Sequence, residues 1–540
     1  MKNKNYQWLT VVTISFIVAT INIFHVIIGL AKTPAGFTYL ATGHYYLDYF
    51  EYLQHISAGI AGRWMPTNYF TISLFPVNWR FFPYVLMGKI AWIFHFSPVS
   101  TYWIAVFVLS FLTLIGFYYL INLMIPKENF LYKIIAFLIA VFSGPVYQVF
   151  MNNGQLILNP YDFWYGPATF IRRFGAVPYH TLGLFLLIII IAVINKIWIM
   201  IIKLSNKEIV VRGFLVAVLI NMLMTFSPIA LASLIPSLLI ISTIRFLKNK
   251  SDRSKIFLFN TIILVLTVPV AFILRQNPGY GGMSFEINWI SHDPWWFVLL
   301  NLGPIILFFP FGLKKYLKED NFLRQLLLIF VLVSYCLFIS PLAYYLGIHN
   351  LRFFSSINYV CYGVLAVFGI KNISLLFNKY NKMGVIMIAS VLIIYSSFLI
   401  FYSLNKRLLG LDQTIPETIW TYTPTQIIEG LQSLHGSSQV NVLAGPYGGV
   451  GMLVPIFSYR RVYVGHPNAT PNIEEKQLIA NRFYTGQMTD KEAINFLKIN
   501  KIGFVILTTY DNFDVNIISR YSFLKPIFIK QSIIIWKVNH

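Results

Sequence analysis

Long apolar runs separated by short polar loops fill about the first three quarters of the chain. Eleven of these runs have a length suited to crossing the hydrocarbon core of a bilayer, which takes about 20 helical residues. The first covers residues 8–30, and the others begin near Tyr102, Leu131, Tyr179, Ile209, Ile229, Ile256, Trp295, Gln325, Phe353 and Met383. The pattern predicts a polytopic α-helical membrane protein with about eleven spans, followed from about residue 405 by a segment of soluble composition.

Composition supports this class of protein and excludes a soluble one. Of 540 residues, 57% are hydrophobic and only 11% are charged, whereas about a quarter of the residues in a soluble domain are charged. The 41 Lys and Arg against 19 Asp and Glu give a net charge of +22. These cations lie in short loops between apolar runs, where the positive-inside rule accounts for them. Nucleic-acid binding is therefore not indicated.

The same cations predict an orientation. Residues 81–96 contain Pro83 and Lys89, and as a helix they would reach only roughly 24 Å, less than the hydrocarbon core. If this stretch does not cross, about 20 of the 28 Lys and Arg before residue 404 face the cytoplasm; if it crosses, only about 6 do. We therefore expect an interfacial or re-entrant helix at 81–96, a cytoplasmic N-terminus in the plasma membrane and an extracytoplasmic C-terminal domain.

With this orientation the outer loops of the membrane part carry only five acids, while the middle of nearly every span lacks ionisable residues. These outer acids are Asp48, Glu51, Asp162, Glu286 and Asp293. Ion-coupled transporters place such groups near the bilayer midplane. The pattern therefore disfavours a transporter or lipid-linked glycan flippase, which stays open as an alternative function.

The first outer loop, residues 31–80, carries a predicted short amphipathic helix at 43–55. Spacing of three and four residues places Asp48, Glu51 and His55 on one face of that helix. The alternative interpretation is a solvated face on an interfacial segment.

Several segments of the outer loops together resemble a known family. They are Asp48-Tyr49-x-x-Tyr52, Gly59, Gly62-Arg63-Trp64, a short helix before Ser97-Pro98-Val99, Asp162, Arg172-Arg173-Phe174, Pro178-Tyr179-His180 and Leu351-Arg352-Phe353. This arrangement resembles the GT-C superfamily of membrane glycosyltransferases, and the likeness extends over nearly the whole chain.

The resemblance implies transfer of a sugar from a polyprenyl-phosphate carrier to a hydroxyl of a glycan, lipid or protein acceptor on the outer face, with inversion. Asp48 would remove the proton of the acceptor hydroxyl. The side chains that would contact the substrate and its lipid phosphate are Asp162, Arg172, Arg173, His180 and Arg352. Many GT-C members carry D-x-D or E-x-D in the first loop, but Leu47 and Tyr49 flank Asp48 here. A divalent metal (Mg or Mn) would therefore have only Asp48 and Glu51 as ligands.

Each of these roles has a plainer alternative. Arg172 and Arg173 would anchor at anionic headgroups, His180 would hydrogen-bond a carbonyl or water at a helix start, Arg352 would extend to the interface, and Asp162 would cap a turn. The missing acidic pair also leaves open a non-catalytic, GT-C-derived scaffold in envelope assembly.

The predicted domains are 1–404, whose outer loops 31–80 and 150–178 carry the chemistry, and an α/β domain at 405–540. In the α/β domain we expect strands at 440–444, 461–464, 502–507 and 533–538, a helix from Thr423-Pro424 to 436, and a capping box of Thr489 and Glu492. The glycine cluster at 445–451 matches no nucleotide-binding motif. The string Arg461-Val462-Tyr463-Val464-Gly465-His466, with Thr470 soon after, resembles one in bacterial GT-C-like proteins and has no assigned chemistry.

Overall fold

The computed structural model describes residues 2–42, 46–163, 166–175, 177–248, 252–276, 282–375, 381–413, 421–436 and 440–539. The chain divides into two compact units. The first, here called the helical unit, consists of Met1–Ile23 and Val106–Asn405; the second, the mixed unit, consists of Phe24–Ala105 and Lys406–His540. The first outer loop therefore groups with the C-terminal segment, which the sequence does not indicate.

Within the described part of the chain, nine helices are long and apolar enough to span a bilayer, which confirms an integral membrane protein. In chain order they are α1 (Lys2–Ala31), α4 (Pro98–Met124), α7 (Pro178–Met200), α8 (Asn206–Phe226), α9 (Ile229–Lys248), α10 (Arg253–Gln276), the combined α12 (Phe297–Leu302), η4 (Gly303–Phe308) and α13 (Phe309–Lys318), α14 (Phe322–Ile339) and α17 (Asn381–Gln413).

Two of the eleven predicted spans form shorter helices. Helix α5 (Phe130–Phe142) has 13 residues and α16 (Asn358–Ser374) has 17. Their lengths are about 20 and 26 Å, against about 30 Å of hydrocarbon. Gly144-Pro145 follows α5 at once, and the residue before a proline avoids the helical region. Hydropathy alone does not register this stop.

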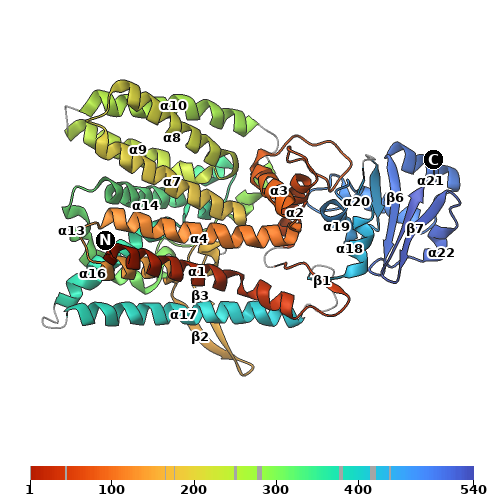
Figure 1. The fold of residues 1–540 in the computed structure, drawn as a ribbon, viewed down its shortest axis with the longest axis horizontal. Coiled ribbons are helices and arrows are strands. Elements are labelled where there is room, and N and C mark those ends of the chain that lie inside the picture. The colour runs from red at the N-terminus through yellow and green to blue at the C-terminus, as the bar shows by residue number, and fades with distance from the viewer. Residues whose placement is uncertain are drawn as a thin grey trace. The chain divides into compact units, whose positions relative to one another are not determined.

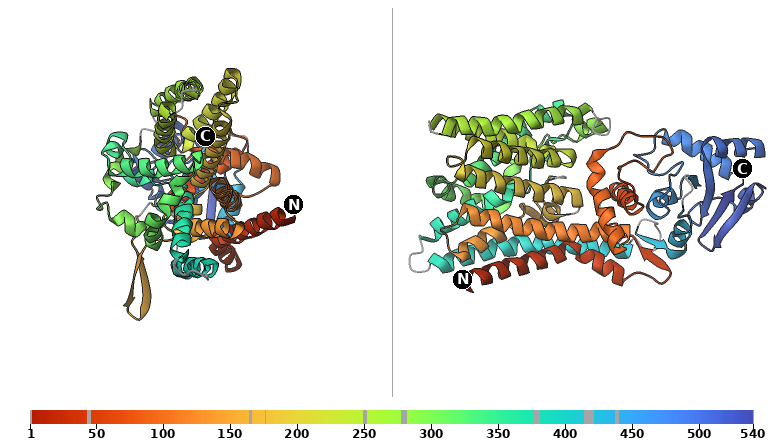
Figure 2. Two further views of the ribbon diagram at one scale, coloured as in Figure 1. Left: turned by 90° about the vertical axis from the view of Figure 1, so that its left-hand side faces the viewer. Right: turned by 45° about the horizontal axis from the view of Figure 1, so that its top comes forward.

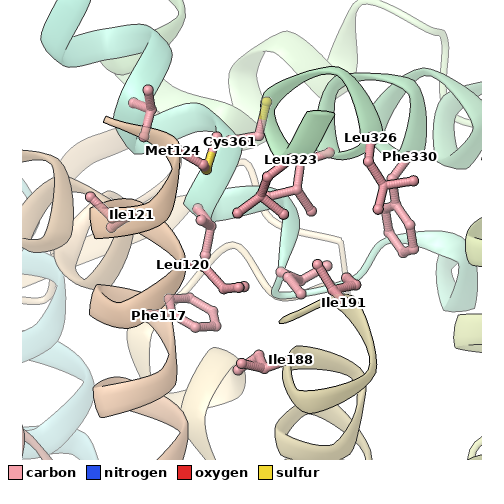
Figure 3. Close-up of a cluster of buried hydrophobic side chains, with 14 of the residues drawn as sticks. Phe117, Leu120, Ile121, Met124, Ile188, Ile191, Leu323, Leu326, Phe330 and Cys361 are labelled. Atoms are coloured by element: carbon pink, nitrogen blue, oxygen red, sulfur yellow. The ribbon is translucent and has the colours of Figure 1, made fainter. Parts of the chain in front are cut away.

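The core of the helical unit is a continuous apolar cluster shared by α4, α7, α14 and α16. Figure 3 shows Phe117 and Leu120 of α4 on the side of that helix toward Ile188 and Ile191 of α7, and Ile121 belongs to the same cluster. From α14 and α16 the side chains of Leu323, Leu326, Phe330 and Cys361 enter the same cluster. Because the cluster is apolar throughout, it holds the helices together and leaves the polar chemistry to the loops at their ends.

Short elements connect the long helices of this unit. They are the strands β2 (Tyr147–Asn152) and β3 (Gln155–Pro160), α6 (Phe170–Phe174), η3 (Gly282–Trp289), α15 (Leu342–Leu346) and η5 (Asn350–Phe353). The strands β2 and β3 pair antiparallel through a two-residue turn, in which Asn153 and Gly154 both have positive φ, 49° and 76°. Asn-Gly is the preferred sequence for such a turn. Figures 1 and 2 show this hairpin extending away from the helices of its unit.

The first outer loop forms two packed helices in the mixed unit. Helix α2 (Tyr46–Ile60) lies against α3 (Phe82–Phe94), which follows the short η1 (Trp79–Phe81). A Cβ added at Gly59 would collide with the carbonyl oxygen of Val85, so glycine permits this close approach. The predicted helix at 81–96 is therefore present, and at 13 residues it is shorter than a span. Residues 43–45 of the predicted helix at 43–55 lie outside the described residues.

The C-terminal segment has the predicted α/β character. A four-stranded sheet has the order β5-β6-β8-β7, with β5 and β6 parallel and the other pairs antiparallel. Its strands are β5 (Asn441–Ala444), β6 (Ile502–Thr508), β7 (Leu524–Lys530) and β8 (Ile533–Val538). The helices are α18 (Thr425–Gln432), α19 (Val450–Phe457), α20 (Ile473–Tyr484), α21 (Asp490–Ile499) and α22 (Val515–Ser519). A second, two-stranded sheet pairs β1 (Phe37–Tyr39) of the first loop with β4 (Tyr422–Pro424).

Most of the predicted elements of this segment are present, and one strand is wrong. The capping box of Thr489 and Glu492 starts α21 as expected. The predicted strand at 461–464 contributes only an isolated bridge between Val462 and Val442. Strand β7 is missed because Pro526 interrupts its pattern, although a proline is tolerated in a strand at the edge of a sheet.

Candidate functional site

The first polar cluster is built on α2. Tyr49, Leu53 and Ile56 are completely buried, and their spacing of four and three residues marks one packed face of a helix. Asp48 and Glu51 lie outside this face and stay partly exposed, so a solvated face that carries the two acids remains the alternative interpretation. Asp48 is in the first turn of α2, where the helix dipole favours a negative charge.

Glu51 is the acid whose environment is most altered in this cluster. Burial, together with the negative charge of Asp48, raises the pKa of Glu51 to about 7, against the opposing effect of the Arg80 guanidinium. A carboxyl group with a pKa near neutrality is suited to accept a proton in catalysis at pH 7.

His55 does not join the two acids as predicted. Its side chain is 2% exposed and its ring stacks on Phe81 with centroids 4.5 Å apart. Burial lowers the pKa of His55 to about 3, so the imidazole is neutral. Its Nε2 lies 3.0 Å from Nε2 of Gln54, and Gln54 in turn accepts the backbone N–H of Tyr69. His55 therefore stabilises the first outer loop by packing and hydrogen bonding.

A divalent metal at Asp48 and Glu51 would have these two carboxylates as its protein ligands. Among the described residues there is no group of three or more His, Cys, Asp or Glu side chains that could hold an ion. Mg²⁺ is commonly held by one or two carboxylates together with waters and substrate phosphates, so the two acids suit an ion that arrives with its substrate. Arg80 supplies positive charge beside Glu51. Metal use stays a prediction, and no step below uses an ion.

The string at 461–466 contacts the first outer loop, close to the acids. His466 donates from Nε2 to the carbonyl oxygen of Leu47 at 2.9 Å, and its Nδ1 accepts the backbone N–H of Asn468 at 3.0 Å. These two bonds define one neutral tautomer, and burial lowers the pKa of His466 to about 4. Leu47 directly precedes Asp48, so the string holds the start of the helix that carries both acids.

Further hydrogen bonds tie the same string to residues 63–73. Thr470 donates its hydroxyl to the carbonyl of Phe70 at 2.9 Å, and the backbone N–H of Val462 donates to Tyr69 at 3.1 Å. Arg461 donates to the carbonyl of Ser73 at 3.2 Å. A sequence motif without known chemistry thus has a structural explanation: it attaches the C-terminal segment to the loop of the acids.

The second polar cluster lies in the helical unit, around Asp162. Arg172 forms an ion pair with Asp162 at 2.9 Å, and Asn301 donates to its other oxygen at 3.2 Å. Burial raises the pKa of Asp162 to about 6, although Arg172 and Asn301 both oppose the rise. The side chain of Arg172 is 43% exposed. It can therefore meet an anion without leaving Asp162.

Arg173 differs from Arg172 in both its exposure and its hydrogen bonds. Its side chain is 2% exposed, and a guanidinium has five N–H donors. All five donate to backbone carbonyls, those of Ala140, Val141, Ser143, Pro167 and Ala168. The guanidinium also lies 3.4 Å from the ring centroid of Tyr359. With its donors occupied, Arg173 holds the loop in place rather than binding a phosphate.

Arg352 forms an ion pair with Glu286, a pairing that the sequence alone does not predict. Its guanidinium makes a two-bonded ion pair with Glu286, with Nε 2.7 Å from Oε2 and Nη2 bonded to Oε1. Glu286 is 2% exposed, and Nε2 of the buried His349 lies 3.9 Å from it. The two residues are 66 positions apart in the sequence, so no local sequence pattern indicates that they pair. Much of the positive charge of Arg352 is therefore balanced within the protein.

The two pairs border one aromatic cluster. Phe163 follows Asp162 and packs with Leu351, which precedes Arg352. The rings of Phe163 and Phe354 stack at 5.8 Å. His180 lies in the first turn of α7, with its ring 4.1 Å from that of Tyr179. The predicted residues Asp162, Arg172 and Arg173 are thus brought together, and Arg352 joins them across the aromatic cluster.

Comparison with known proteins places the fold. No protein-family model matches the chain, and no curated protein matches it. Among solved structures, archaeal oligosaccharyltransferase AglB from Archaeoglobus fulgidus, in complex with an inhibitory peptide and a dolichol-phosphate, is 11% identical with a TM-score of 0.47, over 99% of this chain and 74% of that one. Arabinofuranosyltransferase AftD from mycobacteria is 10% identical with a TM-score of 0.50, over 99% of this chain.

The match to AftD covers 42% of that protein, so this chain spans less than half of its length. AftD is a GT-C membrane glycosyltransferase, and the match to it shows that this chain has the GT-C fold, in agreement with the resemblance of its outer loops.

Proposed function

We propose that this protein is a membrane glycosyltransferase that transfers a sugar from a polyprenyl-phosphate donor to an acceptor hydroxyl on the extracytoplasmic face. The observation that carries the proposal is the acid pair on α2, in which the pKa of Glu51 is raised to about 7 beside Asp48. The GT-C fold supports glycosyl transfer in general. The orientation follows from the Lys and Arg balance of the loops.

The chemistry requires a base, and the acid pair is suited to that role. As the acceptor oxygen attacks the anomeric carbon, its proton passes to the Asp48–Glu51 pair and the bond from the anomeric carbon to the phosphate oxygen breaks. The polyprenyl phosphate leaves with the bonding electrons, and the configuration inverts. The Arg80 guanidinium opposes the rise in the pKa of Glu51, so that a fraction of the Glu51 carboxyl groups is ionised at pH 7.

The departing phosphate needs a cation, and Arg172 has the most accessible guanidinium among Arg172, Arg173 and Arg352. Arg352 has its guanidinium on Glu286 and Arg173 has its donors on carbonyls, whereas Arg172 is nearly half exposed. A guanidinium matches phosphate oxygens through paired N–H donors. We assign Arg172 to the lipid phosphate, Asp162 to orienting Arg172, and Arg173 and Arg352 to positioning the loops. His180 keeps its predicted place among the substrate contacts.

Release of polyprenyl phosphate from a panel of polyprenyl-phosphate sugars tests the proposal. Wild type should release the lipid with at least one sugar, while Asp48→Asn and Glu51→Gln should each lose turnover by about 100-fold or more, as expected for loss of a general base. Asp293→Asn is the matched control, because Asp293 is an exposed outer-loop acid bonded to Ser291. Full activity in both α2 variants would place the base elsewhere, no release by folded wild type with any donor would favour a scaffold, and translocation without release would favour a flippase.

A further inference from the structure

The hairpin β2–β3 is unusual for a connector between membrane helices. Residues 147–160 contain no charged side chain. Val149, Met151 and Leu156 are 58%, 65% and 56% exposed. A water-facing hairpin of this length would normally carry charges along its edges. The exposed side chains of this hairpin are thus apolar groups or amides, and none is charged.

The register makes one face of the hairpin apolar throughout. Val149 pairs with Leu158 and Met151 pairs with Leu156, and directly paired residues project from the same side of a sheet. The opposite face is mixed, since Phe150 and Ile157 pair there between two pairs of amides, Gln148 with Asn159 and Asn152 with Gln155. Only the first face lacks polar side chains, and six residues per strand give it a length of roughly 20 Å.

The base of the hairpin adjoins the Asp162 cluster. Strand β3 runs directly into Tyr161 and Asp162, and the N–H of Tyr161 donates to the carbonyl of Val146 at 2.8 Å. Asn301, which donates to Asp162, also reaches the carbonyl of Tyr161 at 3.4 Å. A molecule bound at Arg172 would therefore lie near the apolar face of the hairpin.

The hairpin also leaves its unit at a depth where lipid chains lie. The ring of Tyr147 stacks on Tyr395 at 4.6 Å, and its hydroxyl donates to the carbonyl of Tyr395 at 3.2 Å. Tyr395 lies midway along the apolar segment Lys382–Leu408. The early end of α5 at Phe142 brings the chain out at this level rather than at the membrane surface.

From this arrangement we propose that the apolar face of β2–β3 binds the polyisoprenyl chain of the donor, whose phosphate meets Arg172. The inference rests on the proposed function, because it takes the donor to be a polyprenyl phosphate. The surface is polar at its base and apolar over about 20 Å. A lipid with an anionic head and one long apolar chain fits it, because the chain can be buried along the apolar part. The hairpin then selects donors by chain length.

The test compares a long-chain donor, such as a C55 polyprenyl-phosphate sugar, with a C10 donor carrying the same sugar. Met151→Asp should raise KM for the long-chain donor by about tenfold, equivalent to about 1.4 kcal/mol of binding, and leave KM for the C10 donor unchanged. Asn152→Asp is the matched control, since it adds the same charge on the opposite face. Leu156→Asp, also exposed, provides a second variant should the first fold poorly.

Three results would overturn the proposal. They are an unchanged KM for the long-chain donor, an equal change for both donors, or disulfide linkage of two copies through Met151→Cys, which would show a second copy covering the face.

If wild type turns over neither donor, the proposed function fails, but binding of the prenyl chain to the hairpin is still tested by photo-crosslinking with a diazirine-bearing prenyl phosphate. Labelling of residues 147–160 would support the site, and labelling elsewhere alone would refute it.

Discussion

At the scale of single residues, the adjacent Arg172 and Arg173 show how burial separates binding from support. Loss of the Arg173 guanidinium would leave five buried carbonyl groups without donors, and each such group costs about 1–3 kcal/mol. We expect Arg173→Met to lower the melting temperature in detergent strongly. Arg172→Met removes the partner of Asp162, whose carboxyl can take up a proton because burial raises its pKa to about 6, so the variant should lose less stability than Arg173→Met and raise KM for the donor. Equal melting temperatures of the two variants would contradict this division.

The pH dependence of transfer tests the environment of Glu51. Because the pKa of Glu51 is raised to about 7, the base is protonated below that pH and ionised above it, and the rate should rise with pH through about 7. Arg80 holds that pKa down, so Arg80→Gln should move the midpoint of the profile to higher pH. Arg80→Lys keeps the charge and should leave the midpoint near that of wild type. An unmoved midpoint in Arg80→Gln would show that Glu51 does not control the rate.

The same carboxyl group should also affect stability. Its pKa is about 7 in the folded protein against an ordinary value of 4.5, so between these values the folded state binds more protons than the unfolded one. The contribution of Glu51 to the free energy of unfolding therefore falls as pH rises from about 4.5 through 7. Glu51→Gln should flatten the pH dependence of the melting temperature in this window. A wild-type slope retained by the variant would place the titrating group elsewhere.

At the scale of elements, the contact of the 461–466 string with α2 predicts an effect on turnover. His466→Phe removes the donor to Leu47 and leaves that carbonyl unsatisfied, which should displace the start of α2. Small displacements of catalytic groups cost up to about 100-fold in rate, so we expect kcat to fall by tenfold or more. His466→Gln, which keeps an N–H donor, should recover part of the loss without shifting the pH profile.

His435→Phe provides the control for this contact. His435 also places Nε2 within hydrogen-bonding distance of a backbone carbonyl, that of Phe457 at 2.6 Å, but this carbonyl is not in the first loop. Its variant should keep the wild-type kcat. A similar loss in both variants would mean that the effect is one of general stability.

Elements with local signals could be predicted from the sequence, and those fixed by distant contacts could not. Apolar runs gave the long helices, and Thr489 with Glu492 gave the start of α21. The short α5 depends on Gly144-Pro145, a signal that hydropathy averages away. In the candidate site, spacing placed Asp48 and Glu51 on one helix, but the stacking of His55 on Phe81 and the pairing of Glu286 with Arg352 arise only in the folded chain.

At the scale of the whole molecule, the grouping of residues 24–105 with the C-terminal segment changes what truncation should do. The predicted domains, 1–404 and 405–540, suggest that the membrane part would keep its first outer loop without the C-terminal domain. In the structure, strand β1 pairs with β4, α2 packs against α19, and His466 holds Leu47. Each of these contacts joins the first loop to residues that truncation would remove.

We therefore expect a chain ending at residue 404 to lose both turnover and the folded state of residues 24–105. Hydrogen exchange should show fast exchange in α2 and α3, while α4, α7 and α14 keep their protection because their shared core lies in the helical unit. Adding residues 405–540 as a separate chain should restore protection of α2, since the lost contacts are non-covalent. Unchanged exchange in α2 after truncation would show instead that the first loop folds by itself and that the C-terminal segment only covers it.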